Sequence, residues 1–460
     1  MKCRTIVVFL ALVPAACTTV PKDAGFGDVQ RAVGDRTGRL IQWNGRTADD
    51  AEVAAMVRGL LAQPLTCDQA VQIALLNNRH LQGSFEDLGV AQADLVQAGL
   101  LKNPVFSLQV RVPERSPART YLDIAVVEDF LDVALLPARK ALAEDQFEQA
   151  KAEVTDQALT LAADTSAAFY AYQAAVTIAD LHRQIAQAAA AGLDTARGMH
   201  DAGNMTDLDY VMERAREARM RIELGDAQAE VDEAREKLTD LMGLDGSTEW
   251  SVTPTLGDVP DQDPALDGLE SLAARQRLDV VVAQKEVQIE AKSLGMTEDF
   301  RLVQDLDLGA EGERETDGQW RIGPSISVPA PIFDQGQAAV AGAKAKLRRS
   351  EERLAGLEVD VRSQVRAAVE RLIHARAKAS IYRGEIIPAQ EEVNRQMQLQ
   401  YNGMLTGVFQ LLEAHEEQVE AQRQYVESVR DYWTARVELE RAIGGRLSTA
   451  TTSPSVGDRP

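Results

Sequence analysis

Histidine and cysteine are the residues of this chain that could hold a metal ion or act as nucleophiles. No two of the five histidines have the spacing that places two metal ligands on one helical face, so we interpret them as solvated surface residues. They are His80, His182, His200, His374 and His415. The sequence also shows no glycine-rich phosphate loop after a strand, no nucleophile elbow and no Cys/His cluster. These observations predict a protein that is no enzyme and that binds no cofactor.

The N-terminus has the layout of a bacterial export signal. Lys2 and Arg4 precede an apolar run over residues 5–13, which is too short to span a bilayer as a helix. The small residues before Cys17 resemble a lipobox, in which the cysteine is lipidated, although Pro14 stands where an aliphatic residue is preferred. Two interpretations remain open, a signal peptide at 1–17 ending at a lipidated Cys17 or an ordinary signal with a nearby cleavage site.

Cysteine usage and net charge limit the other possibilities. With Cys3 removed in the signal and Cys17 lipidated, Cys67 is the remaining thiol, so no intrachain disulfide can form. The formal net charge of -22 argues against nucleic acid or anionic lipid headgroups as main partners, because both require clustered basic residues.

The chain is an internal duplication. Landmark pairs recur at nearly constant offsets of 294 − 95 = 199, 403 − 203 = 200 and 444 − 243 = 201 residues: Leu95 with Leu294, Gly203 with Gly403, and Gly243 with Gly444. The predicted segments are an N-terminal periplasmic segment at 18–65, a first repeat at 66–244, a linker at 245–263, a second repeat at 264–445 and a disordered tail at 446–460.

Each repeat is predicted to contain a helix, two short strands, a very long helix, a turn and a final helix. In the long helices, apolar and small residues advance by three or four positions over 147–179 and again over 347–375. Helices of about 60 residues would extend roughly 90 Å, far beyond a globular domain, so a helical tube or coiled-coil rod is expected. Pro388 should kink the second long helix near Ile387, whereas the first repeat has no such proline near Ala188.

The segments between the helices alternate apolar and polar residues with a period of two. Such segments occur at about 104–113, 120–130, 300–311 and 320–329. Ten-residue strands with this period are typical of membrane barrels, although a half-buried soluble sheet gives the same pattern. Four strands cannot close a barrel, and open edges in lipid leave backbone groups unpaired. We therefore expect several chains to share one barrel, and a trimer would supply twelve strands.

The sequence resembles the TolC-like outer-membrane efflux protein family, in its lipoprotein branch, from about Thr66 to Gly445. The matching stretches are LTCDQAVQIALLNN, QADLVQAGLLKNP, PAPIFDQGQAAVAGAKAKL, IIPAQEEV and YNGMLTGVFQLLEA. The resemblance implies a homotrimer with a twelve-stranded barrel in the outer membrane and a long helical tunnel across the periplasm. It also implies a periplasmic adaptor, or membrane fusion protein, and an inner-membrane pump as partners.

The family's acidic gate position corresponds to Glu413 in LLEA. A second acid found one turn earlier in some members is Gln410 here, and Glu416 lies one turn beyond Glu413. One Glu413 per chain would form a ring of three carboxylates that favours cations and opens on protonation or on binding of a partner. Taken alone, the run EAHEEQVE indicates an ordinary solvated helix surface.

The helical turns are the positions at which this family contacts its adaptor. They correspond here to Gly203, Asn204, Met205 and Thr206 in the first repeat, and to Gly403, Met404, Leu405 and Thr406 in the second. Gly203, Gly403 and Gly407 are expected to be turn residues that accept a positive φ. The methionines near the turns suit turn packing, and contact with a soft metal or an adaptor is the alternative.

Three functions remain open at this point. The leading prediction is the passive outer-membrane duct of a tripartite efflux system, lipid-anchored and with a large periplasmic part. The exit duct of a type I protein-secretion system would use the same fold. A lipid-anchored periplasmic coiled-coil scaffold without a pore is the alternative from another class.

Overall fold

A computed structural model describes residues 19–45, 48–114, 119–262, 265–303 and 305–447. The expected signal peptide at 1–17, its Cys17 and the tail beyond 447 lie outside the described residues, so those expectations stay predictions. Within these ranges no helix combines the length and the apolar character needed to cross a membrane.

The same order of elements occurs twice along the chain. Before the first repeat lie α1 (Phe26–Thr37) and α2 (Ala48–Leu61). The first repeat contains α3 (Cys67–Asn77), α4 (Arg79–Ala98), β1 (Val105–Arg111), β2 (Tyr121–Asp129), α5 (Phe130–Asp201) and α6 (Asp207–Leu241). The second contains α7 (Leu269–Gln276), α8 (Leu278–Asp299), β3 (Asp307–Arg314), β4 (Trp320–Ser327), α9 (Gln337–Ile381), the π-helix η1 (Tyr382–Ile386), α10 (Ile387–Asn402) and α11 (Val408–Ile443).

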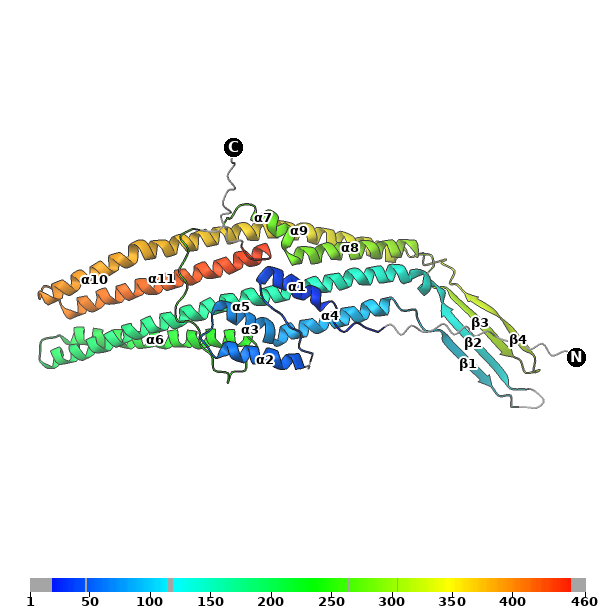
Figure 1. The fold of residues 1–460 in the computed structure, drawn as a ribbon, viewed down its shortest axis with the longest axis horizontal. Coiled ribbons are helices and arrows are strands. Elements are labelled where there is room, and N and C mark those ends of the chain that lie inside the picture. Colours follow the sequence, from blue (N-terminus) through cyan, green and yellow to red (C-terminus); the bar gives the residue numbers. More distant parts are fainter. Residues whose placement is uncertain (1–18, 46–47, 115–118, 263–264, 304, 448–460) are drawn as a thin grey trace, which may run out of the picture.

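The molecule is a long rod with the sheet at one end and two helical hairpins, α5–α6 and α10–α11, at the other (Figure 1). The short helices α1, α2, α3 and α7 surround the middle of the rod. Three clusters of buried side chains hold this middle part together: one joins α7, α9 and α11, one joins α1, α3, α4 and α5, and one joins α2, α3, α5 and α6.

The long helices bury the face that the sequence predicts. In α5, Val154, Ala158, Thr165 and Ala168 are buried, in steps of three, four or seven residues along the helix. Many of these residues are alanines, whose small side chains let α5 approach α6, α11 and α4 closely.

Proline and asparagine interrupt helices at two places. The expected first helix is two helices, because Asn78 ends α3 with ψ 124° and caps α4 by accepting a hydrogen bond from the Leu81 N–H at 3.0 Å. In the second repeat the π-helix η1 precedes Pro388, which lacks an N–H and so cannot continue the α-helical hydrogen bonding. The first-repeat helix α5 runs without a break past Ala188 over 72 residues.

The four strands form one antiparallel sheet in the order β1-β2-β3-β4. Leu108 pairs with Ile124, Ile124 with Gly312, and Gly312 with Ile322, so these positions share one face of the sheet. The edges of this sheet are β1 and β4.

The third strand begins later than the sequence pattern suggested. It spans Asp307–Arg314 instead of 300–311, since Phe300 ends α8 and its N–H donates to the Met296 carbonyl. The reason lies in side-chain size. The apolar face of β3 carries Ala310 and Gly312, which give little hydrophobic signal, so the larger residues before the strand were mistaken for it.

Candidate functional site at the helical tips

The turns of the two helical hairpins lie at the same end of the rod, opposite the sheet (Figure 1). In the first turn the Asn204 N–H donates to the Met199 carbonyl at 2.8 Å, and in the second the Leu405 N–H donates to the Gln400 carbonyl at 2.9 Å. The two turns therefore close with the same hydrogen bond at an offset of 405 − 204 = 201 residues.

The left-handed position of each turn is occupied by a different residue type. Gly203 has φ 76°, as expected, but Gly403 and Gly407 have φ near −82° and −89°, so that expectation was wrong for both. The left-handed residue of the second turn is Met404, with φ 58°. The repeat alignment placed the glycine one residue too early, because the hydrogen-bonded turn is shifted by one position.

The tips expose apolar side chains. Met404 is 93% exposed and Leu405 is 81% exposed, and Leu208 at the start of α6 is exposed as well. Thr206 caps α6, since its hydroxyl accepts a hydrogen bond from the Asp209 N–H at 3.1 Å. In the second repeat Gly407 takes the capping position and offers no side chain.

The expected gate residues lie on α11 one to three turns behind the tip, in different surroundings. Gln410 and Glu413 are exposed and have no hydrogen bond or ion pair with the residues that the structure describes. Glu416 is engaged with the other repeat, because Arg216 Nε on α6 donates to Glu416 Oε1 at 3.0 Å. Arg216 also lies 3.5 Å from Glu213, so one guanidinium faces two carboxylates.

Two residues that the sequence reasoning missed position this region. An added Cβ at Gly192 of α5 would lie 2.8 Å from Leu412, so this glycine lets α11 approach α5 closely next to Glu413. The second is Arg216, which occupies the position equivalent to Glu416 at the repeat offset of 200. Opposite charges at equivalent positions of a duplication were a signal that could have identified this pair.

A histidine at the first tip responds to pH. His200, in the last turn of α5, has Nε2 2.8 Å from the Asp207 carboxylate and its ring stacked on Tyr210. The hydrogen bond to Asp207 raises the pKa of His200 above its ordinary value, and Asp201 adds to the effect. Protonated His200 thus links the end of α5 to the start of α6 across the turn.

We expect the first tip to be more ordered at low pH. Because the folded-state pKa of His200 is raised, its stabilisation is fully present below the ordinary pKa of about 6.5 and is lost as pH rises through the raised value. Amide exchange over 202–206, corrected for intrinsic rates, should therefore be slower at about pH 5.5 than at about pH 8.5. His200→Gln should remove the difference, and His374→Gln, at an exposed histidine elsewhere, should keep it. Equal pH dependence in both variants would contradict this assignment.

The fold defines a class of protein. Residues 272–445 match the family model of the outer membrane efflux proteins, and the resemblance to the TolC-like family found in the motifs is confirmed. The chain is 21% identical over 384 residues to the cobalt-zinc-cadmium resistance protein CzcC of Cupriavidus metallidurans, covering 83% of this chain and 91% of CzcC.

Solved structures share the fold at low sequence identity. The outer membrane channel CmeC of Campylobacter jejuni superposes with a TM-score of 0.71 at 14% identity, over 84% of this chain and 86% of CmeC. The outer membrane protein VceC of Vibrio cholerae gives a TM-score of 0.65 at 19% identity, over 83% of this chain and 97% of VceC.

Proposed function

We propose that the chain is one protomer of a trimeric outer-membrane channel, a passive export duct that catalyses no reaction. The observation that carries this proposal is a four-stranded sheet with one exposed apolar face and two edges, at the end of a 72-residue helix. A single hairpin of this kind would fit a soluble sheet. Its combination with helices far longer than a domain favours a barrel continued by a tunnel.

The apolar face of the sheet suits lipid. Across the register it carries Phe106, Leu108, Val110, Leu122, Ile124, Val126, Leu308, Ala310, Trp320, Ile322 and Ile326. In the single chain Phe106 is 74% exposed and Ile322 is 81% exposed, and soluble proteins rarely expose so continuous an apolar surface. A membrane around the sheet would cover this face.

The edges of the sheet require further copies of the chain. An unpaired edge in hydrocarbon leaves backbone N–H and C=O groups without partners, at several kcal/mol each. If β1 of one chain pairs with β4 of the next, the ring closes, and three copies of the four strands give a twelve-stranded barrel. We therefore propose a homotrimer.

The opposite face of the sheet suits a water-filled lumen. It carries Asp123, Asp307, Glu311 and Glu313 against two basic residues, Arg111 and Arg321. An acidic lumen favours cations over anions. Metal cations are one substrate class that fits, and the relative CzcC is named for resistance to cobalt, zinc and cadmium.

The remaining parts follow the family pattern. We propose that the barrel lies in the outer membrane, that the helices form a periplasmic tunnel, and that a lipid on Cys17 helps to anchor the chain. The exposed tips, with Met404 and Leu405, would contact a periplasmic adaptor, which links the channel to an inner-membrane pump. The adaptor and pump would make this a tripartite efflux system.

The test uses the full chain with Cys17→Ala, extracted in detergent. The channel proposal predicts three-fold symmetric particles by electron microscopy, trimers that dissociate on heating, and cation-selective conductance in planar bilayers. A pore-less scaffold predicts release from membranes once the lipid is lost, and no conductance. A stable water-soluble monomer would overturn the proposal.

For the gate, we propose that Glu413 forms a carboxylate ring and that the Arg216–Glu416 pair holds α11 against α6. Arg216→Gln should leave Glu416 without its partner, and a charged hydrogen bond of this kind is worth about 1.5 to 3 kcal/mol. The equilibrium should shift toward the open entrance by roughly tenfold or more. Glu413→Gln should also raise conductance, by removing charge from the ring.

Conductance of purified trimers and entry of large antibiotics into cells measure both effects. Glu391→Gln, at an exposed glutamate on α10, is the matched control and should behave as the unmodified protein. Unchanged conductance and leakage in Glu413→Gln would show that the carboxylate ring is not the barrier. The same result for Arg216→Gln would show that the ion pair does not hold the entrance closed.

A further inference from the structure

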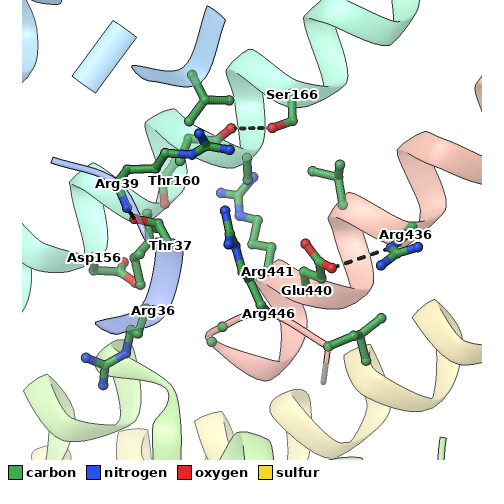
Figure 2. Close-up of a pocket in the computed structure, with 18 of the residues that line it drawn as sticks. Arg36, Thr37, Arg39, Asp156, Thr160, Ser166, Arg436, Glu440, Arg441 and Arg446 are labelled. Carbon is green, nitrogen blue, oxygen red and sulfur yellow. Dashed lines mark hydrogen bonds and ion pairs between the residues drawn. The ribbon is translucent and has the colours of Figure 1, made fainter. Parts of the chain in front are cut away.

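A polar cavity of about 660 Å³ lies between the two repeats, in the middle of the rod (Figure 2). It is enclosed by α5 and the end of α11, with the end of α1, the start of α3 and the α7–α8 junction completing its wall. Six arginines line it against four carboxylates, an excess of positive charge in a chain whose net charge is -22. Such a local reversal of charge is typical of a site for an anion.

Three guanidinium groups, from Arg39, Arg441 and Arg446, point into the same space (Figure 2). Within the part of the chain that the structure describes, Arg446 has no ion pair or hydrogen bond. Arg39 pairs with Asp68, yet its Nε is buried and has no hydrogen-bond partner. A buried donor without a partner costs about 1 to 3 kcal/mol, so these groups are arranged for an acceptor from outside the chain.

The carboxylates of the cavity offset this charge only in part. Burial raises the pKa of both Asp156 and Glu440 above the ordinary value, which favours their neutral forms. Asp68 is largely exposed and binds Arg39 from the solvent side. The interior of the cavity is therefore positive.

An aromatic surface lies beside the arginines. Tyr170 of α5 and Trp433 of α11 both line the cavity, with ring centroids 5.4 Å apart and planes inclined by 19°. Such rings provide a flat apolar surface against which the body of a ligand can pack. The cavity volume is also in the range of small-molecule sites and is much larger than a bare inorganic ion needs.

We propose that this cavity binds a small soluble phosphate monoester with a flat apolar body. Three guanidinium groups approaching from separate segments suit a tetrahedral group with three terminal oxygens, whereas a carboxylate offers two oxygens in one plane. The phosphate would lie among Arg39, Arg441 and Arg446, and the body of the ligand would lie against Tyr170 and Trp433.

A soluble source fits better than a lipid headgroup. Asp156 lies 156 − 130 = 26 residues along α5 from Phe130, where the helix leaves the sheet. At 1.5 Å per residue this is about 39 Å, beyond the reach of a headgroup held in a bilayer around the sheet. This step alone rests on the proposed membrane position of the sheet.

The experiment titrates the full-length, lipid-free protein in detergent with adenosine monophosphate by calorimetry, at constant ionic strength. Adenosine, inorganic phosphate and citrate are titrated in parallel. We expect one site per chain for adenosine monophosphate and at least tenfold weaker binding of each of the other three. No saturable binding of adenosine monophosphate would overturn the proposal. Equal binding of adenosine would exclude the arginines as the determinant, and equal binding of citrate would exclude a phosphate-specific site.

Variants assign the site to its residues. Arg446→Gln and Arg39→Gln should each weaken binding of adenosine monophosphate at least tenfold. Arg366→Gln, at an exposed arginine of α9 outside the cavity, should leave it unchanged. Helical circular dichroism of each variant separates misfolding from loss of the site, and Arg446→Lys, which keeps the charge and loses the planar fork, should be intermediate. Unchanged binding in both glutamine variants would overturn the proposal, whether or not the protein conducts ions.

Discussion

Leu108→Lys is expected to prevent assembly of membrane-inserted trimers, whereas Gln109→Lys at the next position should assemble normally. The two residues are neighbours on β1 and point to opposite faces of the sheet, since Leu108 pairs with Ile124 and Gln109 with Asp123. A lysine on the lipid face costs about 2 to 4 kcal/mol near the bilayer midplane, and the trimer would carry three of them. A lysine at position 109 would face the acidic residue Asp123 and water.

Heat-sensitive trimers on gels and the outer-membrane fraction of cells measure this difference. The pair of variants is informative because both introduce the same side chain at adjacent positions of one strand. If Gln109→Lys were the damaging variant, the apolar face would be the interior of the assembly. If the two variants assembled equally well, the sheet would not lie in a membrane.

Gly243→Ala is expected to destabilise the first repeat by more than about 2 kcal/mol. Gly243 ends the last helix of that repeat with φ 64°, a left-handed conformation that costs about 1 to 2 kcal/mol for a residue with a side chain. An added Cβ would lie 2.6 Å from the Asn77 carbonyl oxygen. The backbone would then have to move, and the hydrogen bond that the Asn77 amide donates to the Met242 carbonyl at 3.0 Å would be strained.

The midpoint of helical unfolding in denaturant measures this effect. Gly225→Ala is the matched control, because Gly225 lies inside α6 with open space around it, and it should be stabilising by about 0.5 to 1 kcal/mol. Gly444→Ala should be intermediate, since its added Cβ would lie 3.1 Å from the Arg277 backbone. Equal midpoints for Gly243→Ala and Gly225→Ala would contradict the contact with Asn77.

Local pattern was sufficient for much of the architecture. Steps of three and four residues predict the face that α5 buries, because one helix carries that information in its own sequence. Period-two alternation likewise predicts which side of β1, β2 and β4 is apolar. The pattern failed at β3, where small residues on the apolar face left too weak a signal.

Contacts between the repeats could not be predicted from sequence in this way. Whether Glu416 pairs with Arg216, and that Glu413 stays exposed, depends on how two helices 200 residues apart are rotated against each other. The left-handed residue of the second tip is Met404 and not Gly403, because the closing hydrogen bond selects the position.

The sequence by itself determined the duplication, the long helices, the four strands and the family. Only the tertiary structure decided which charges meet, and it placed Arg39 from the N-terminal region beside Arg446 from the C-terminal region in one cavity. The physical reason is that periodicity reports the surroundings of one element at a time. A site made by several elements depends on their packing, which has no signature in any single segment.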